Sequence, residues 1–388
     1  MTQRIVMPGL MEVGAGALNK VAELLTLIGC QKPLIITDRV MAQLGYVPKV
    51  ETLLSSQGIQ CGVFLDTEPE PTEASILPAV DQVLSGQFDS LIALGGGSAI
   101  DSAKAIGLLA KHGGRMRDYK VPYVVNQAIL PVIAIPTTAG TGSEVTRVTI
   151  ITDQNSDEKM LCMGPGLIAR AAIIDFELTL SVPARIAADT GIDALTHAIE
   201  AYVSVKASGF TDQQALAAMR LIAPNLRTAV TRPDNIDAKE QLMLGATLAG
   251  MAFSNASVAL VHGMSRPIGA HFHVPHGMSN AMLLPAITEY SVAASPERYA
   301  ACARAMGLAD IQTSDEQAVQ CLLTELKQLN ADLNVPTLAE FGVEKSHYFS
   351  VLDIMAEQAL ASGSPGNNPR VPSKEEVIDL YKTVWSEQ

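Results

Sequence analysis

The sequence predicts an α/β domain followed by an all-α helical domain, on two observations. Up to about residue 181, short apolar runs rich in Val and Ile alternate with helical segments, which is typical of a parallel sheet covered by helices. Beyond Ser181-Val182-Pro183 the chain becomes rich in Ala, Leu and Met, with helical periodicity and few β-branched runs. We therefore place a domain boundary at 181, between residues 1–181 and residues 182–388.

Length and composition agree with two domains and exclude several classes of protein. At 388 residues, the chain exceeds the roughly 250–300 residues at which single cores stop growing. A net charge of −13 argues against nucleic-acid and anionic-membrane partners, which need a basic face. No stretch reaches the roughly 18 apolar residues of a membrane helix. The five cysteines are dispersed, which favours reduced thiols and a cytoplasmic location.

In chain order, the first part contains apolar strands separated by turns and helices. A strand, a glycine turn and a helix are expected over residues 4–27. Helices are expected over 73–85 and 99–110. The later strands are 33–37, whose composition is that of a buried strand, and 62–66, 90–94, 130–135, 148–152 and 171–175. A loop carrying Lys159 is expected between the last two strands.

A glycine turn between the strand 90–94 and the helix that follows is the strongest local signal in this part. Gly95, Gly96, Gly97 and Ser98 leave room for a phosphate to approach the backbone N–H groups at the helix start, where the helix dipole favours negative charge. The pattern is not the usual dinucleotide fingerprint, because Ile100 stands where a third glycine is due. Tight strand–helix packing is the structural alternative.

Two more segments follow strands and suit a nucleotide. Asp38 ends the strand 33–37, where a carboxylate can accept hydrogen bonds from a ribose and repel a 2′-phosphate. An ordinary helix cap is the alternative for Asp38. The segment 136–144 follows the strand 130–135, and its hydroxyl side chains suit contacts with phosphate, ribose or a nicotinamide amide.

The second part is expected to be entirely helical. The loop 362–369 looks like a surface turn before the last helix. The expected helices are 183–204, 211–230, 237–255, 256–270, 277–290, 296–305, 315–330, 347–359 and 373–386.

This part also carries a candidate metal site. Asp193 and His197 are four residues apart, so a helix would place them on one face. A second stretch contains further histidines, His262, His271, His273 and His276. A carboxylate with three imidazoles forms a four-ligand site for Fe²⁺ or Zn²⁺. A helix turn with unrelated surface histidines is the alternative.

Several long motifs, in the same order, resemble the iron-containing (group III) alcohol dehydrogenases, a family that includes lactaldehyde reductases and 1,3-propanediol dehydrogenases. The resemblance covers nearly the whole chain. Its motifs are the glycine turn continued through Asp101 and Lys104, the segment 136–146, Gly191–Ala198, His276–Gly277 with 280–285, and Asn368-Pro369-Arg370.

The resemblance implies a nucleotide-binding α/β domain, a helical metal-binding domain, and an active site in the cleft between them. It implies the metal ligands Asp193, His197, His262 and His276. It implies that NAD(H) contacts Asp38, Gly95, Gly96, Gly97, Ser98, Asp101, Thr137, Thr138, Thr141 and Lys159. It also implies a homodimer or larger homo-oligomer, and it favours iron, although zinc fits the same ligands.

Three positions depart from the family pattern. Arg266 replaces a histidine often assigned to proton transfer, and an arginine cannot act as a base at neutral pH. We therefore consider His271 or His273 for that role. Arg266 could instead bind a substrate carboxylate, sulfonate or phosphonate, or pair with a neighbouring acid. Glu70 stands in place of an asparagine near the adenine, and Phe176 in place of a proline after Asp175.

The sequence therefore predicts an NAD-dependent, metal-dependent dehydrogenase that interconverts small primary alcohols and aldehydes. One alternative is a reductase of an acidic carbonyl compound, such as a maleylacetate-like substrate or an anionic aldehyde. Another is a lyase similar to dehydroquinate synthase, although its polyanionic substrate would call for more basic residues. A non-catalytic metal-binding or scaffold protein would leave the nucleotide loops unexplained. Formation of NADH with a simple alcohol would separate the dehydrogenase from the lyase.

Overall fold

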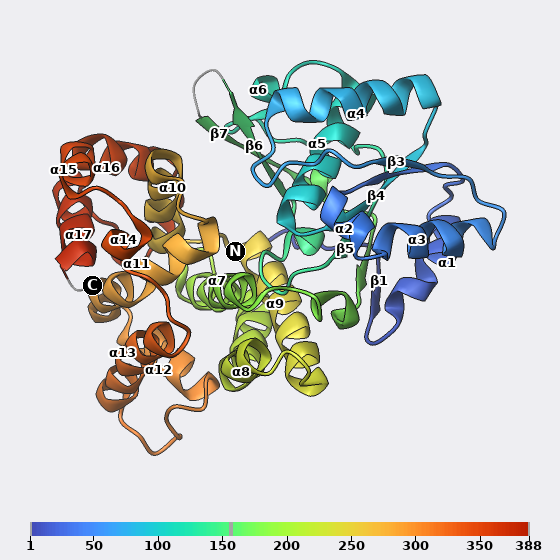
Figure 1. The fold of residues 1–388 in the computed structure, drawn as a ribbon. Coiled ribbons are helices and arrows are strands. Elements are labelled where there is room, and N and C mark those ends of the chain that lie inside the picture. The colour runs from blue at the N-terminus through green and yellow to red at the C-terminus, as the bar shows by residue number, and fades with distance from the viewer. Residues whose placement is uncertain (1, 155–157, 387–388) are drawn as a thin grey trace. The chain divides into compact units, whose positions relative to one another are not determined.

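The computed structural model describes residues 2–154 and 158–386, and its chain forms two compact units. One unit is Arg4–Val182, and the other contains the chain from Pro183 onward. A parallel sheet with helices makes up the first, and helices make up the second (Figure 1). The predicted fold class is confirmed.

The first unit is built on a six-stranded sheet in which all neighbouring strands are parallel. Strands β2, β4, β5 and β8 are buried along their whole length, as expected when helices cover both faces. In the order of the sheet, the strands are β1 (Leu10–Val13), β8 (Ala171–Ile174), β5 (Val132–Pro136), β4 (Ser90–Gly95), β2 (Pro33–Ile36) and β3 (Gly62–Phe64).

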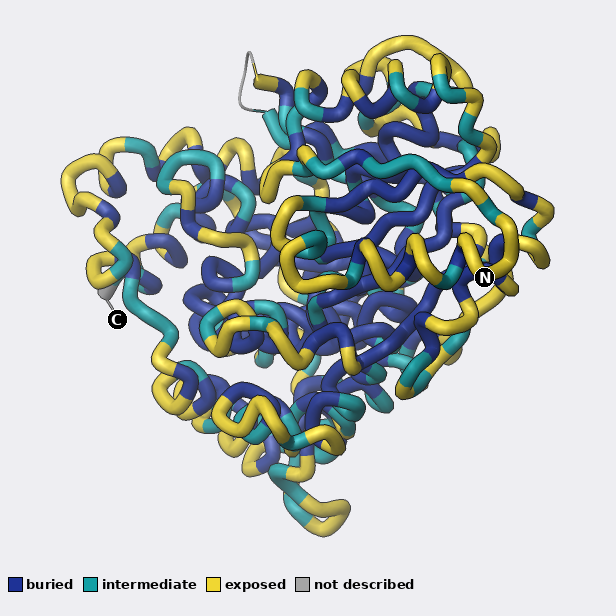
Figure 2. Tube along the Cα trace, turned by 45° about the vertical axis from the view of Figure 1, so that its right-hand side comes forward, coloured by how far each residue is buried: buried dark blue, intermediate teal, exposed yellow. Residues whose placement is uncertain are grey.

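Alternate side chains of the strands enter two separate cores. Leu34 and Ile36 pack with α4 (Glu73–Gly86) and α5 (Gly97–His112) on one face. Ile35 packs with α1 (Val21–Leu27) and α3 (Tyr46–Ser55) on the other face. The central strands β2, β4, β5 and β8 therefore form the buried interior of this unit, and the outer sides of its helices are exposed (Figure 2). The period of two along a strand produces this division.

The order of the sheet reverses between β2 and β4, because the chain runs outward through β3 and then returns to the other side of β2. Ile36 is paired with Ala93, and the Thr37 hydroxyl donates to the Leu94 carbonyl at 2.7 Å. Asp38 and Gly95 therefore leave the carboxyl ends of adjacent parallel strands. This reversal point is where open α/β sheets bind their ligands.

Some elements of the first unit differ from the sequence prediction. The expected loop around Lys159 is wrong, because Lys159 lies on β7 (Glu158–Met163), which forms an antiparallel hairpin with β6 (Val148–Asp153). The segment of β7 begins with two charged residues, and only alternate side chains in its second half are buried. It therefore lacks the continuous apolar run by which the other strands were predicted. Helices α2 (Arg39–Gln43), α3 and α6 (Met116–Tyr119) were not predicted, and of these α2 and α6 are short, with 5 and 4 residues.

The second unit contains helices throughout. Two predicted helices have different limits: the break between α9 and α10 includes Ser257 at φ 69°, and the helix expected at 347–359 is divided. The helices are α7 (Ala184–Val203), α8 (Gly209–Thr231), α9 (Ile236–Ala256), α10 (Leu260–Phe272), α11 (His276–Ser291), α12 (Pro296–Ala305), α13 (Asp315–Asp332), α14 (Leu338–Phe341), α15 (Lys345–Ser350), α16 (Leu352–Ala361) and α17 (Lys374–Ser386).

Within the described residues, no single helix is long and apolar enough to cross a membrane. By length and composition alone, the pair α9 and α10 meets that test only when taken together, across a bend of 101°.

The loop 362–369 is not a surface turn, so that prediction is wrong. Asn367 and Asn368 are buried, and Asn367 Nδ2 donates to the Ser257 hydroxyl and the Val258 carbonyl, both at 3.0 Å. A Cβ on Gly263 would lie 2.7 Å from the Pro365 ring. The loop thus packs on the start of α10, a long-range contact that its polar composition did not indicate.

Candidate metal centre and nucleotide-binding loops

Helix α7 supplies the first two residues of the predicted metal site. It begins after Pro183, and residues 191–203 are all buried, so polar side chains along it face other helices. Asp193 and His197 are only 2% and 4% exposed. The His197 ring stacks on Phe253 of α9 with a centroid separation of 4.1 Å. The ring also stacks with that of His262 at a centroid separation of 4.5 Å, so two neighbouring rings hold the imidazole in place.

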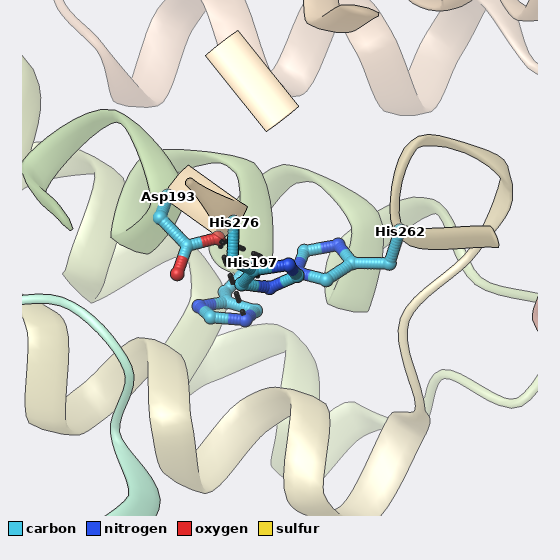
Figure 3. Close-up of side chains that lie close together, drawn as sticks. All are labelled: Asp193, His197, His262 and His276. Atoms are coloured by element: carbon cyan, nitrogen blue, oxygen red, sulfur yellow. Dashed lines mark ion pairs between the residues drawn. The ribbon is translucent and has the colours of Figure 1, made fainter. Parts of the chain in front are cut away.

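Helices α10 and α11 bring the other two histidines to the same place (Figure 3). Asp193 Oδ1 lies 3.8 Å from His197 Nε2, 3.4 Å from His262 Nε2 and 3.9 Å from His276 Nε2. One ligand atom from each of the four residues falls within 4.8 Å of the others. Three of the residues are buried, while His276 is exposed. The side chains predicted from spacing and resemblance therefore converge.

The arrangement fits a divalent cation. Four ligand atoms about 2.1 Å from a tetrahedral ion lie about 3.4 Å apart, close to the observed separations from Asp193. Asn280 Nδ2 donates to Asp193 Oδ1 at 2.7 Å and lies 3.1 Å from His262 Nε2 and 3.3 Å from His276 Nε2. Its buried Oδ1 has no hydrogen-bond partner among the described residues. A buried unsatisfied acceptor beside three ligands points to a partner from outside the protein.

The charges of the cluster reinforce each other. Burial alone would raise the pKa of Asp193, but the adjacent imidazoles of His197, His276 and His262 hold it below its usual range. Burial opposes protonation of His262, yet Glu200 and Asp193 raise its pKa to about 9. The cluster therefore favours an ionised Asp193 beside a protonated His262, as expected of a carboxylate that holds positive charge next to it.

Two residues that contact the ligands were not singled out by the sequence analysis. Glu200 of α7 binds His262 Nδ1 at 2.6 Å, and Asn280 of α11 binds Asp193. A signal was present for both, because Glu200 is three residues after His197 and Asn280 is four residues after His276. On a helix, these spacings place each residue beside the ligand that precedes it.

The predicted catalytic residues lie elsewhere on α10. Arg266 is half-buried and forms no ion pair with any residue in 2–154 or 158–386, so the expected pairing with a neighbouring acid is not found. Burial lowers its pKa, and the charge of Glu200 opposes that effect. His271 Nε2 lies 2.9 Å from Gln358 Oε1, and His273 is exposed with a left-handed φ of 54°. Neither belongs to the four-residue cluster.

In the first unit, the glycine turn packs directly against the threonine loop. Gly95 has φ 152°, and a Cβ there would lie 2.8 Å from Ala99. A Cβ on Gly97 would lie 2.9 Å from Thr141 Cγ2, and one on Gly96 would lie 3.5 Å from Thr138 Oγ1. Both segments follow adjacent strands, since Gly95 is paired with Pro136. Tight strand–helix packing, the structural alternative, is therefore present, and the anion site at the start of α5 stays a prediction.

A buried lysine fixes the end of the threonine loop. Lys104 Nζ donates to the carbonyls of Ser143, Thr146 and Val148 at 2.7–2.9 Å, and to Thr146 Oγ1 at 3.0 Å. Burial lowers its pKa to about 8, against the charges of Asp101 and Glu144.

Asp101 accepts from the Ser143 hydroxyl at 2.6 Å and from the Ile150 N–H at 3.0 Å. Both of its oxygens are engaged within the protein, so any effect of Asp101 on a nucleotide would be indirect.

The remaining predicted nucleotide residues are placed as follows. Asp38 accepts from the Met41 N–H at 2.9 Å and caps α2, which is the alternative interpretation, although only one oxygen is used. Ser98 donates to the Pro69 carbonyl.

Lys159 Nζ lies 3.0 Å from Glu70, so the departure at position 70 provides a partner for that lysine. Phe176, the other departure, is buried. Thr137 is also buried, directly after β5.

Comparison with known proteins agrees with this organisation. The sequence profile of the family "iron-containing alcohol dehydrogenase" matches residues 8–176, and that of its C-terminal domain matches residues 187–385. Long-chain-alcohol dehydrogenase 1 of Geobacillus thermodenitrificans is 40% identical over 367 residues, covering 93% of this chain and 92% of that protein. Lactaldehyde reductase of Escherichia coli is 35% identical and covers 99% of this chain and 100% of its own.

Solved structures give the same result. A crystal structure of 1,3-propanediol oxidoreductase superposes with a TM-score of 0.94 at 34% identity, covering 99% of this chain and 100% of that chain. Sulfoacetaldehyde reductase from Bifidobacterium kashiwanohense, solved with NAD⁺, has a TM-score of 0.89 at 26% identity, with both chains fully covered. The expected oxidoreductase class is thereby confirmed. The chain belongs to the iron-containing alcohol dehydrogenase family.

Proposed function

We propose that this enzyme transfers hydride between NAD(H) and small primary alcohols or aldehydes at a divalent metal ion. The observation that carries the proposal is the convergence of Asp193, His197, His262 and His276 from three helices. When bound, the ion would act as a Lewis acid on the substrate oxygen and the nicotinamide would carry the hydride. The four side chains would hold the ion, and the exposed His276 marks the side on which a substrate can approach.

We propose that residues 1–181 form the dinucleotide-binding domain and residues 182–388 the metal-binding domain. Gly95, Gly96, Gly97 and Ser98 would bind the diphosphate at the start of α5, which is long enough to have a substantial dipole. Asp38, at the end of the neighbouring strand, would accept hydrogen bonds from the ribose. Contacts of Thr137, Thr138, Thr141 and Lys159 with NAD(H) remain predictions.

Iron is our choice of metal, based on the family. A carboxylate with three imidazoles accepts either Fe²⁺ or Zn²⁺, and intrinsic affinity favours zinc. The proton-transfer role of His271 and the substrate contact of Arg266 also remain predictions. We further propose a cytoplasmic homodimer or larger homo-oligomer, with five unpaired cysteines and with no nucleic-acid or membrane partner.

The direct test combines metal analysis with an activity panel. Anaerobically purified protein should contain about one Fe²⁺ or Zn²⁺ per chain and should reduce NAD⁺ with short primary alcohols. A carboxylated or sulfonated aldehyde in the same panel tests the acidic-carbonyl alternative. Absence of activity with every alcohol, aldehyde and ketone, despite a filled site, would refute the proposal.

The acid after β2 should determine the choice of cofactor. In Asp38→Asn, loss of the negative charge near a 2′-phosphate should raise the NADPH/NADH ratio of kcat/KM by about tenfold, equal to about 1.4 kcal/mol. The amide can still accept the Met41 N–H, so α2 should keep its cap. Steady-state kinetics with both cofactors provide the measurement. Asp81→Asn, at an exposed carboxylate on α4, is the control and should leave the ratio unchanged.

A further inference from the structure

The carboxylate of Glu200 lies beside the metal cluster without belonging to it. It is 3% exposed, and its two oxygens each accept one short hydrogen bond. Oε2 lies 2.6 Å from His262 Nδ1, and Oε1 lies 2.6 Å from the Val261 N–H. A buried carboxylate needs such partners to compensate for its lost hydration. Both of these side-chain hydrogen bonds of Glu200 are therefore made to the first turn of α10.

Helix geometry explains how Glu200 reaches this position. Asp193, His197 and Glu200 lie at i, i+4 and i+7 of α7, so they share one face of that helix. Helix α10 begins at Leu260, and its N-cap, Ala259, offers no side-chain hydrogen bond. Glu200 supplies that missing acceptor from a different helix, and its charge is favourable at a helix N-terminus.

The contact also determines which nitrogen of His262 is free. A carboxylate only accepts hydrogen bonds, so Nδ1 must carry the hydrogen, and the lone pair of the neutral ring is then on Nε2. Nε2 is the atom 3.4 Å from Asp193 Oδ1, within the ligand cluster. We propose that Glu200 is the positioning residue of the metal centre: it fixes the tautomer and orientation of His262 so that Nε2 faces the ion.

The proposal depends on the metal site proposed above and adds a residue to it. A carboxylate behind a ligating histidine makes the ring a better donor and removes its rotational freedom. Loss of such a partner typically weakens metal binding by about 10- to 100-fold. A residue that only capped α10 would change stability without changing the affinity of the folded protein for metal.

The experiment is a titration of the metal-depleted, full-length enzyme with Co²⁺, whose visible absorption reports on the geometry of a nitrogen and oxygen site. Glu200→Gln should weaken Co²⁺ binding by about 10- to 100-fold. The single amide oxygen introduced by this substitution can accept from the Val261 N–H or from His262 Nδ1, but not from both. Its NH₂ group, which is a donor, would then face the remaining donor. The Co²⁺-shifted imidazole N–H signal of His262 in ¹H NMR should also move or exchange faster in the variant.

The matched control is Glu73→Gln in the first unit. Glu73 is also buried, and it likewise accepts one side-chain and one backbone donor, Arg115 Nε at 3.0 Å and the Met116 N–H at 3.1 Å. This variant should bind Co²⁺ as the wild type does. If Glu200→Gln does not fold, Glu200→Asp replaces it, since the shorter carboxylate cannot reach both donors and should also weaken binding.

The outcomes separate the two proposals. A folded Glu200 variant with wild-type Co²⁺ affinity and an unchanged N–H signal would overturn the positioning role while leaving the metal site intact. A wild-type enzyme that takes up no Co²⁺ would overturn the metal site itself.

Discussion

Asp193→Asn should abolish metal retention and lower kcat/KM for alcohol oxidation by about a thousandfold, equivalent to about 4 kcal/mol. Asp193 is the only anionic member of the cluster, and its Oδ1 lies within 3.9 Å of all three imidazole Nε2 atoms. An amide of the same size removes the charge without leaving a cavity. Metal content by mass spectrometry and steady-state kinetics on the same preparation provide the measurement.

A carboxylate one turn earlier on α7 is the control. Asp189 is also buried, but it pairs with Arg185 at 2.5 Å and is not in the cluster. Asp189→Asn should retain its metal and keep kcat/KM within a few-fold of wild type. If both variants lose metal and activity to the same extent, the negative charge on α7 retains the metal, and ligation by Asp193 does not.

Lys104→Met should destabilise the first unit by about 3–5 kcal/mol, because it leaves the negative charges of Asp101 and Glu144 without the buried cation that compensates them. It also removes the donor shared by the carbonyls of Ser143, Thr146 and Val148, so the threonine loop should loosen. Denaturant unfolding measures the first effect. A rise in the dissociation constant for NADH, measured by fluorescence, detects the second.

Lys111→Met tests whether any lysine on α5 would have the same effect. Lys111 donates only to the Ile129 carbonyl, at 3.3 Å, and its side chain is more exposed. Its replacement should change the free energy of unfolding by less than about 1 kcal/mol, as is usual at surface positions. If Lys104→Met is equally mild, the buried lysine does not organise the loop.

Local patterns predicted much of the fold because they are set by neighbouring residues. Short apolar runs identified the strands of the sheet, and helical periodicity identified most helices of the second unit. The loop at 362–369 could not be predicted in the same way, since its burial depends on Asn367 reaching Ser257 across the sequence. The strand containing Lys159 was missed for a related reason, since only its partner β6 makes it a strand.

Helical spacing predicted the two ligands that share one turn of a helix. The choice of the other two ligands came only from the family resemblance. Asp193 and His197 follow from helical spacing, but nothing local to His262 shows that its Nε2 approaches Asp193. Two other histidines, His271 and His273, lie between His262 and His276 and are not in the cluster. A histidine-rich stretch therefore indicates a site without identifying its members.

The four metal ligands come from three helices, α7, α10 and α11. Metal binding should therefore increase the free energy of unfolding of the helical unit. An ion that binds only the assembled helices pulls the equilibrium toward them by mass action, adding about 2.7 kcal/mol when its free concentration is a hundred times its dissociation constant. The sheet unit contributes no ligand and receives none of this gain. Chelation should therefore lower the melting temperature of the helical unit and leave that of the sheet unit unchanged.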